Sequence, residues 1–259
     1  MKTLGVIASR YGSSRLPGKA LKDICGRPMV WWVYNSICGA EGLDELIVAT
    51  DDDRIVEVCN QYNIPTIMTG TEHREAANRL HEVSEKMEAD YYIQINGDEP
   101  LLSKSYVSAI IEDSIPSDVE YGANLIAKMN NPVEVVDASN IKVVFDENRN
   151  TCYMSRTPIP YPYRSIDFSY YKHIGIIGYN KKMLDFYATH GPGMFERIEG
   201  IATLRFTDYG KILKCIEVEE MESLSIDTQM DLDFIRKVIA NKLENGELAS
   251  FKEKIEKGL

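Results

Sequence analysis

The 259-residue chain lacks long hydrophobic runs and has few cysteines. A membrane-spanning helix needs about 20 consecutive apolar residues, and no run approaches that length. The chain also passes from "MKTLGVIA" straight into a basic loop, without a charged and then apolar leader. The five cysteines are odd in number and widely spread, which argues against a disulfide framework or a zinc site. We therefore expect a soluble, cytoplasmic protein.

The chain also has fewer basic than acidic residues: it contains 29 Lys and Arg against 40 Asp and Glu, which gives a formal net charge of -11. Nonspecific nucleic-acid binding depends on clustered Lys and Arg, so we expect no nucleic-acid partner. Against this background the stretch "SRYGSSRLPGK", residues 9–19, is basic. A folded core has no use for its uncompensated charges. The loop therefore indicates one local anion.

Strand and helix patterns alternate through the first half of the chain. Apolar runs typical of buried parallel strands alternate with helix-length patterns, of which "HREAANRLHEVSEKM" is clearly amphipathic. This order predicts an α/β fold with right-handed crossovers and a doubly wound, mostly parallel sheet. The predicted strands are 3–8, 45–50, 65–69 and 91–96, and the predicted helices begin near residues 28, 52 and 73.

The second half changes to β-rich runs, which we expect to be separated by turns instead of helices. "DENRN" is a plausible hairpin connection, and the proline-rich and tyrosine-rich segment 156–171 reads as an exposed, extended arm. We predict a single α/β domain over 1–242 with a β-rich excursion at about 127–180, whose arm forms a homodimer. A helical tail over 243–259 follows a break at Asn245 and Gly246, and Thr228 is the expected cap of the long helix before it.

The basic loop follows the first predicted strand, and ligands of doubly wound sheets sit at the carboxyl ends of strands. Its glycines let backbone amides approach a phosphate, its serines donate hydrogen bonds and its cations supply charge. The loop has neither the GKS or GKT of a P-loop nor the spaced glycines of a dinucleotide fold. A solvated basic turn is the alternative. The candidate phosphate ligands are Arg10, Gly12, Ser13, Ser14, Arg15 and Lys19.

Two carboxylates are candidate metal ligands. Asp98 follows the fourth strand in "INGDEP", and Asp227 precedes the last long helix in "SIDTQMD". Each has an ordinary alternative, a turn for Asp98 and a helix cap for Asp227. Two carboxylates with Mg²⁺ and a Lys/Arg cradle are the minimal equipment for phosphoryl or nucleotidyl transfer. We therefore expect Asp98 and Asp227 to converge on one metal.

Five segments in order carry a family resemblance: "SRYGSSRLPGKALKDICGRPM", "ELIVATDDDRI", "INGDEP", "YKHIGIIGY" and "SIDTQMDL". Together they resemble the 3-deoxy-manno-octulosonate (Kdo) cytidylyltransferases, or CMP-Kdo synthetases, from about residue 3 to residue 238. The resemblance implies a nucleotide-diphospho-sugar transferase-like fold. It also implies that CTP and an acidic sugar give a CMP-sugar and pyrophosphate, with Mg²⁺ and in a homodimer.

The resemblance also assigns roles to residues. Arg10, Arg15 and Lys19 would hold the CTP triphosphate, with Lys19 offsetting charge on the leaving pyrophosphate. Asp98 and Asp227 would ligate Mg²⁺, and the sugar hydroxyl would attack directly, without a side-chain nucleophile. The acidic sugar would be bound by Arg156, His173 and Tyr179. For His173 a satisfied histidine within a strand is the alternative reading.

The chain departs from the family pattern in four segments. Asn96 stands where the family usually has Gln, residues 75–77 read Glu-Ala-Ala in place of Ser-Gly-Thr, and Ala202 and Thr203 replace Glu and Gln. The first strand also ends "IASR" in place of "IPAR". The triphosphate and metal residues are intact. Three readings follow: a Kdo cytidylyltransferase, a cytidylyltransferase for another acceptor (amino-substituted octulosonate, nonulosonate or phosphonate), and a nucleotide-binding protein without turnover.

Overall fold

The apolar run after the N-terminus forms strand β1 (Thr3–Ser9), an interior strand of the sheet. The computed structural model describes residues 1–13, 15–219 and 225–258. β1 pairs in parallel with β4 (Glu45–Thr50) on one side and β6 (Tyr91–Asn96) on the other, and β5 (Thr66–Met68) extends this half beyond β4. Both faces of β1 are buried, as its continuous hydrophobicity requires. The parallel half predicted from the sequence is confirmed.

Strand β10 (Tyr171–Tyr179) is antiparallel to its neighbours β6 and β7 (Gly122–Lys128), and β11 (Leu213–Val218) continues in parallel beyond β7. Within the described residues the order is therefore β11-β7-β10-β6-β1-β4-β5. β10 is the one reversed strand in this path, so the sheet is mixed but mostly parallel.

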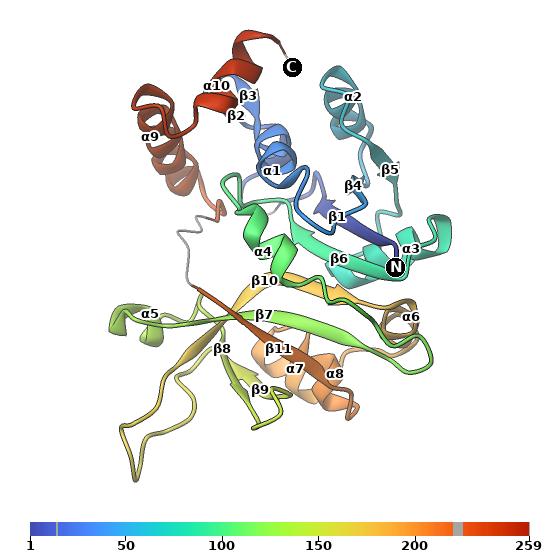
Figure 1. Ribbon diagram of the computed structural model, residues 1–259, viewed down its shortest axis with the longest axis vertical. Helices are drawn as coiled ribbons and strands as arrows, with labels where there is room; N and C mark the ends of the chain where they lie inside the picture. The colour runs from blue at the N-terminus through green and yellow to red at the C-terminus, as the bar shows by residue number, and fades with distance from the viewer. Residues whose placement is uncertain (14, 220–224, 259) are drawn as a thin grey trace.

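Helices cover both faces of the sheet, as the doubly wound prediction requires (Figure 1). α1 (Met29–Ile37), α2 (Asp53–Gln61), α4 (Lys104–Ala109) and α9 (Gln229–Glu244) contribute to one hydrophobic core. α3 (Ala76–Lys86), α6 (Lys181–Thr189) and α8 (Leu204–Asp208) contribute to the other. The shorter elements are η1 (Lys19–Leu21), β2 (Asp23–Ile24), β3 (Arg27–Pro28), α5 (Pro132–Val136) and α7 (Met194–Glu199).

The β-rich excursion contains the predicted hairpin. β8 (Lys142–Phe145) and β9 (Thr151–Ser155) pair antiparallel, and the carboxylate of Asp146 accepts the backbone N–H groups of Asn148 and Asn150 across the turn. The chain after β9 forms a loop that projects from the lower left of the molecule in Figure 1. This loop is the arm expected over 156–171.

The expectation of turns instead of helices between the β-rich runs is wrong between β7 and β8, where α5 lies. The sequence analysis made no assignment for the stretch between β10 and β11, where α6, α7 and α8 lie. α6 buries Met183, Leu184, Phe186 and Tyr187 against the second core. These buried residues recur at helical spacing, and the other positions of the helix are mostly polar. The side chain of Asn180 also caps the helix, so the sequence does carry a helical pattern here.

The C-terminal segment packs onto α1. Thr228 caps α9 as predicted, in a reciprocal pair with Asp231, and α9 ends at Glu244 before α10 (Ala249–Glu256). In α10, Phe251 stacks on Trp32 with ring centroids 5.2 Å apart. In the part of the chain that the structure describes, no helix is both long and apolar enough to cross a membrane.

Candidate functional site

Three cavities join into one groove along the carboxyl ends of β1 and β6. The first, of about 200 Å³, is walled by the basic loop, Asp98 and Asp227. The second, of about 220 Å³, shares Arg10 and Asp98 with the first and adds the N-terminus of α3. The third, of about 200 Å³, shares Glu75 and Asn96 with the second and extends to β10.

Two larger cavities, of about 400 and 420 Å³, lie around Pro116 at the opposite end of the sheet, near the amino ends of β6 and β7. Ligands of open α/β sheets bind at the carboxyl ends of the strands. The charged groups predicted from the sequence also gather in the groove and not around Pro116. The groove is therefore the candidate site.

Lys19 is the centre of the first cavity. Its ammonium Nζ lies 2.8 Å from Asp98 Oδ2 and 3.3 Å from Asp227 Oδ1, and it also donates to the carbonyl oxygen of Ile226 at 2.8 Å. Arg15 Nη2 lies 2.9 Å from the same Asp227 oxygen. Asp98 and Asp227 thus both contact the Lys19 ammonium, although they come from distant parts of the chain. That they bind one metal stays a prediction.

Local structure explains how the two carboxylates meet. Gly97 begins the turn after β6, where a Cβ atom would lie 2.8 Å from the carbonyl oxygen of Ala8, so only glycine permits this approach to β1. The backbone N–H of Ile226 donates to the carbonyl oxygen of Asp98 at 2.9 Å, which holds the segment before α9 against the turn after β6. Asp231 Oδ2 accepts the backbone N–H of Asp227 at 3.1 Å and fixes it at the helix cap.

The other predicted loop ligands divide into three groups. Arg10 and Ser13 line the first cavity, together with Arg15 and Lys19. Gly12 is not among its lining residues, so its role stays a prediction. Ser14 lies outside the described residues. Tyr11, which the sequence reading did not single out, fixes the loop through its backbone N–H to Asp51 and its ring under Arg54, whose guanidinium carbon is 3.4 Å from the ring centroid.

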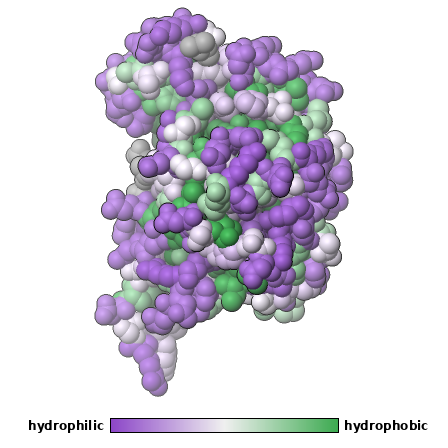
Figure 2. All heavy atoms as spheres, turned by 45° about the vertical axis from the view of Figure 1, so that its right-hand side comes forward, coloured by the Kyte–Doolittle hydropathy of each residue, from purple (hydrophilic) through white to green (hydrophobic). Residues whose placement is uncertain are grey.

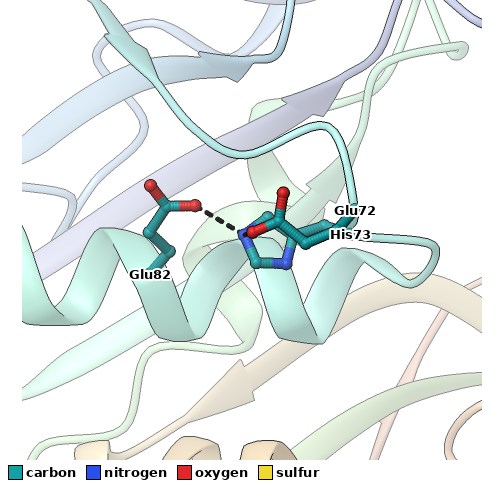
Figure 3. A group of neighbouring side chains, drawn as sticks. All are labelled: Glu72, His73 and Glu82. Atoms are coloured by element: carbon teal, nitrogen blue, oxygen red, sulfur yellow. Dashed lines mark hydrogen bonds and ion pairs between the residues drawn. The ribbon is translucent and has the colours of Figure 1, made fainter.

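The second cavity contains residues that the sequence analysis missed. His73, Arg74 and Arg79 line it. Arg79 is 3% exposed and pairs with Asp51 at 3.1 Å. His73, to which the sequence analysis assigned no role, hydrogen-bonds Glu82 (Figure 3).

Glu82 is already satisfied in this cluster. Burial opposes its ionisation, but hydrogen bonds from Lys86, the Gly70 amide and His73 lower the pKa of Glu82 to about 2. Glu72, the third member, is exposed and its carboxylate lies 4.0 Å from His73. The cluster therefore fixes the loop before α3 against that helix.

His173 and Tyr179 line the third cavity. His173 Nδ1 lies 2.6 Å from Asn124 Oδ1, and burial lowers the pKa of His173 to about 4, so the imidazole is neutral at pH 7. Burial raises the pKa of Tyr179. Three of the four departures from the family pattern line this same cavity: Asn96, residues 75–77, and the pair Ala202 and Thr203. The fourth, at Ala8 and Ser9, lines the first cavity.

Arg156 is not among the lining residues of the third cavity. Its guanidinium donates to the carbonyl oxygens of Glu199 at 2.9 Å, Ala138 at 2.9 Å and Gly200 at 3.3 Å. These bonds tie the end of β9 to the end of α7. Gly200 does line the cavity, so Arg156 supports its wall from behind.

The sequence pattern of the family described as Cytidylyltransferase matches residues 4–217. The chain belongs to this cytidylyltransferase family. It is 39% identical over 234 residues to the 3-deoxy-manno-octulosonate cytidylyltransferase of Fusobacterium nucleatum, covering 90% of this chain and 95% of that protein. It is 33% identical over 232 residues to the 8-amino-3,8-dideoxy-manno-octulosonate cytidylyltransferase of Shewanella baltica (strain OS155), covering 88% and 94%.

A solved structure of a CMP:2-keto-3-deoxy-manno-octonic acid synthetase complexed with CTP superimposes on this cytidylyltransferase with a TM-score of 0.87. The two are 35% identical, and the match covers 94% of this chain and 100% of that one. The predicted family resemblance, the fold class and the assignment as a nucleotidyltransferase are confirmed.

The lowered pKa of His173 predicts a pH dependence of stability. The unfolded chain takes up this proton near pH 6.5 and the folded chain only near pH 4, so the imidazole lowers stability as pH falls between these values. Between pH 7 and pH 5 its contribution is about 2 kcal/mol. Urea unfolding of His173→Gln should show a correspondingly smaller stability loss over this range. An unchanged slope in His173→Gln would contradict the account.

Proposed function

We propose that this cytidylyltransferase transfers the cytidylyl group of CTP to an acidic sugar of the Kdo type and releases pyrophosphate. The observation that carries the proposal is the convergence of Asp98 and Asp227 on Lys19 at one end of a groove whose other end is a polar cavity around His173. The acceptor's hydroxyl oxygen attacks the α-phosphorus and forms an O–P bond. The bond from the α-phosphorus to the bridging oxygen breaks, pyrophosphate leaves with the electron pair, and the hydroxyl proton passes to water.

The first cavity suits the triphosphate. Arg10, Arg15 and Lys19 are cations on its wall, and charge-assisted hydrogen bonds to phosphate oxygens are among the stronger polar interactions in proteins. Arg10 has no hydrogen bond or ion pair with any described residue, so it is available to a ligand. Lys19 is held at the carboxylates, where its ammonium can offset charge that develops on the leaving pyrophosphate.

The donor set of the first cavity fits Mg²⁺. Asp98 and Asp227 offer carboxylate oxygens, the ligands that hard divalent cations prefer, and the Lys19 ammonium between them shows that the position holds positive charge. Asp98 Oδ1 and Asp227 Oδ2 have no hydrogen-bond donor among the described residues. A bound Mg²⁺ would neutralise phosphate charge and align the α-phosphate.

The third cavity suits the acceptor. It opens into the second cavity and through it reaches the phosphate end, so one groove accommodates both substrates. His173 and Tyr179 contribute polar atoms to its wall, and Arg156 supports the wall through Gly200. We place the reaction in the cytoplasm, where CTP is available, and propose no nucleic-acid or membrane partner.

Asparagine variants at the two carboxylates test the proposal. Asp98→Asn and Asp227→Asn each remove a negative charge at constant size, so we expect pyrophosphate release from CTP, Mg²⁺ and Kdo to slow by about 100-fold or more. Asp233→Asn, an exposed carboxylate on α9, is the matched control and should keep full activity. Full activity in both site variants would refute the proposed roles. CTP binding by the wild-type protein without any turnover of acidic sugars would favour the non-catalytic alternative.

We also propose that the protein forms a homodimer through its β-rich excursion. Tyr161, Tyr163 and Ile166 on the arm are 81%, 86% and 88% exposed, and Val133 and Val136 on α5 are each 71% exposed. Large apolar side chains at this exposure are costly to leave in water, and aromatic residues are enriched at interfaces.

Light scattering should therefore give a mass of about twice the 29.4 kDa of the chain at micromolar concentration. The double substitution Tyr161→Asp and Tyr163→Asp should produce a monomer. Met230→Asp, at an equally exposed position on α9, should leave the dimer intact. A wild-type monomer would count against the interface.

A further inference from the structure

Glu75 brings a negative charge without a protein partner into the third cavity. It stands at the N-cap of α3, but its side chain makes no capping hydrogen bond. Within the described part of the chain it has no hydrogen bond or ion pair. The residues that line the third cavity include no Lys or Arg. The carboxylate therefore lies at the groove without a direct cationic partner, although the Arg205 guanidinium is near enough to interact with it through its charge.

Two of the arginines near Glu75, Arg205 and Arg79, are already engaged, whereas Arg10 and Arg74 line the second cavity that Glu75 also lines. Arg205 is 4% exposed and forms a bidentate pair with Glu196, with both N–O distances at 2.7 Å. Arg79, one turn along α3, is paired with Asp51. Neither guanidinium can turn to Glu75 without leaving another buried carboxylate unpaired, which costs more than it gains.

Two further polar groups of the third cavity, His173 and Tyr187, have capacity for a ligand, and the amides of Gln94 and Asn96 can both donate and accept. The Asn124 amide nitrogen donates to the Leu125 carbonyl oxygen, so its oxygen faces His173 and the imidazole proton lies on Nδ1. His173 Nε2 then carries a lone pair, since burial keeps this ring neutral. Tyr187, whose ring lines the cavity, is 1% exposed and its hydroxyl has no hydrogen-bond partner.

A ligand with several N–H donors and a positive charge fits this wall best. A primary ammonium group has three donors and matches a carboxylate and an imidazole lone pair. A hydroxyl in the same place has one donor and leaves the Glu75 charge without a counter-ion. The acidic end of such an acceptor has its own partners, because Arg10 and Arg74 line the adjoining second cavity.

We propose that the preferred acceptor is an acidic sugar that carries a primary ammonium group, and that Glu75 selects it. The inference rests on the proposed function, since it concerns the acceptor of the same reaction. The ammonium group takes no part in bond making or breaking and stays protonated throughout. Its contact with Glu75 sets which sugar binds, and the phosphate end of the groove performs the transfer.

The test compares kcat/KM for Kdo and for 8-amino-3,8-dideoxy-manno-octulosonate at saturating CTP and Mg²⁺. The wild-type protein should prefer the amino sugar by about tenfold or more, the effect of one well-placed charged contact. In Glu75→Gln the ratio of the two values should fall at least tenfold, mainly through KM. Because the ratio is taken within one variant, a general loss of activity cancels.

Two controls separate charge from other effects. Glu72→Gln alters an exposed glutamate three residues away that lines none of the three cavities, and it should keep the wild-type ratio. The N-acetylated amino sugar has similar connectivity but lacks the positive charge of the ammonium group, so the protein should not prefer it over Kdo. Glu75→Ser, which restores the family's residue, should shift preference toward Kdo.

A wild-type preference for Kdo, or an unchanged ratio in Glu75→Gln, would overturn the inference while the proposed function stands. Absence of pyrophosphate release with every acidic sugar would overturn the proposed function and the inference with it. The two failures are therefore distinguishable in one set of measurements.

Discussion

One ammonium group holds together the phosphate end of the groove. Lys19 Nζ contacts Asp98 from the turn after β6, and Asp227 and the Ile226 carbonyl from the segment before α9. Two carboxylates this close repel each other unless a cation lies between them. The Lys19 side chain is 15% exposed, so water screens the interaction only in part. The basic loop, β6 and the α9 cap are thereby fixed relative to one another.

The groove separates the proposed phosphate site from the proposed acceptor site within one fold. Its first cavity lies where parallel strands β1 and β6 end, and its third lies against the reversed strand β10 and the helices that follow. Substitutions in the third cavity that alter acceptor preference can therefore occur without displacing Lys19, Asp98 or Asp227. Three of the four departures from the family pattern fall in the third cavity, and the fourth, at Ala8 and Ser9, falls in the first.

The sequence predicted best what depends on local pattern. The apolar runs of β1, β4 and β6 and the cap at Thr228 were located closely, and Lys19, Asp98 and Asp227 were recognised because they follow or precede such elements. The sequence analysis made no assignment for α6, although its buried residues recur at helical spacing behind the Asn180 cap. Glu75 was noted only as a departure, since an unpaired charge becomes visible when its spatial neighbours are known. Arg156 was assigned to the acceptor by the family resemblance, yet its guanidinium donates to backbone carbonyls.

The central claim is that Lys19 links the two carboxylates and the triphosphate. Calorimetric titration of CTP in the presence of Mg²⁺ tests it most directly, with Lys19→Ala compared with Lys22→Ala, a nearby lysine that lines none of the three cavities. The account predicts that Lys19→Ala weakens CTP binding at least tenfold, about 1.4 kcal/mol or more, and that Lys22→Ala binds as the wild type does. Equal CTP affinities in Lys19→Ala and the wild type would contradict it.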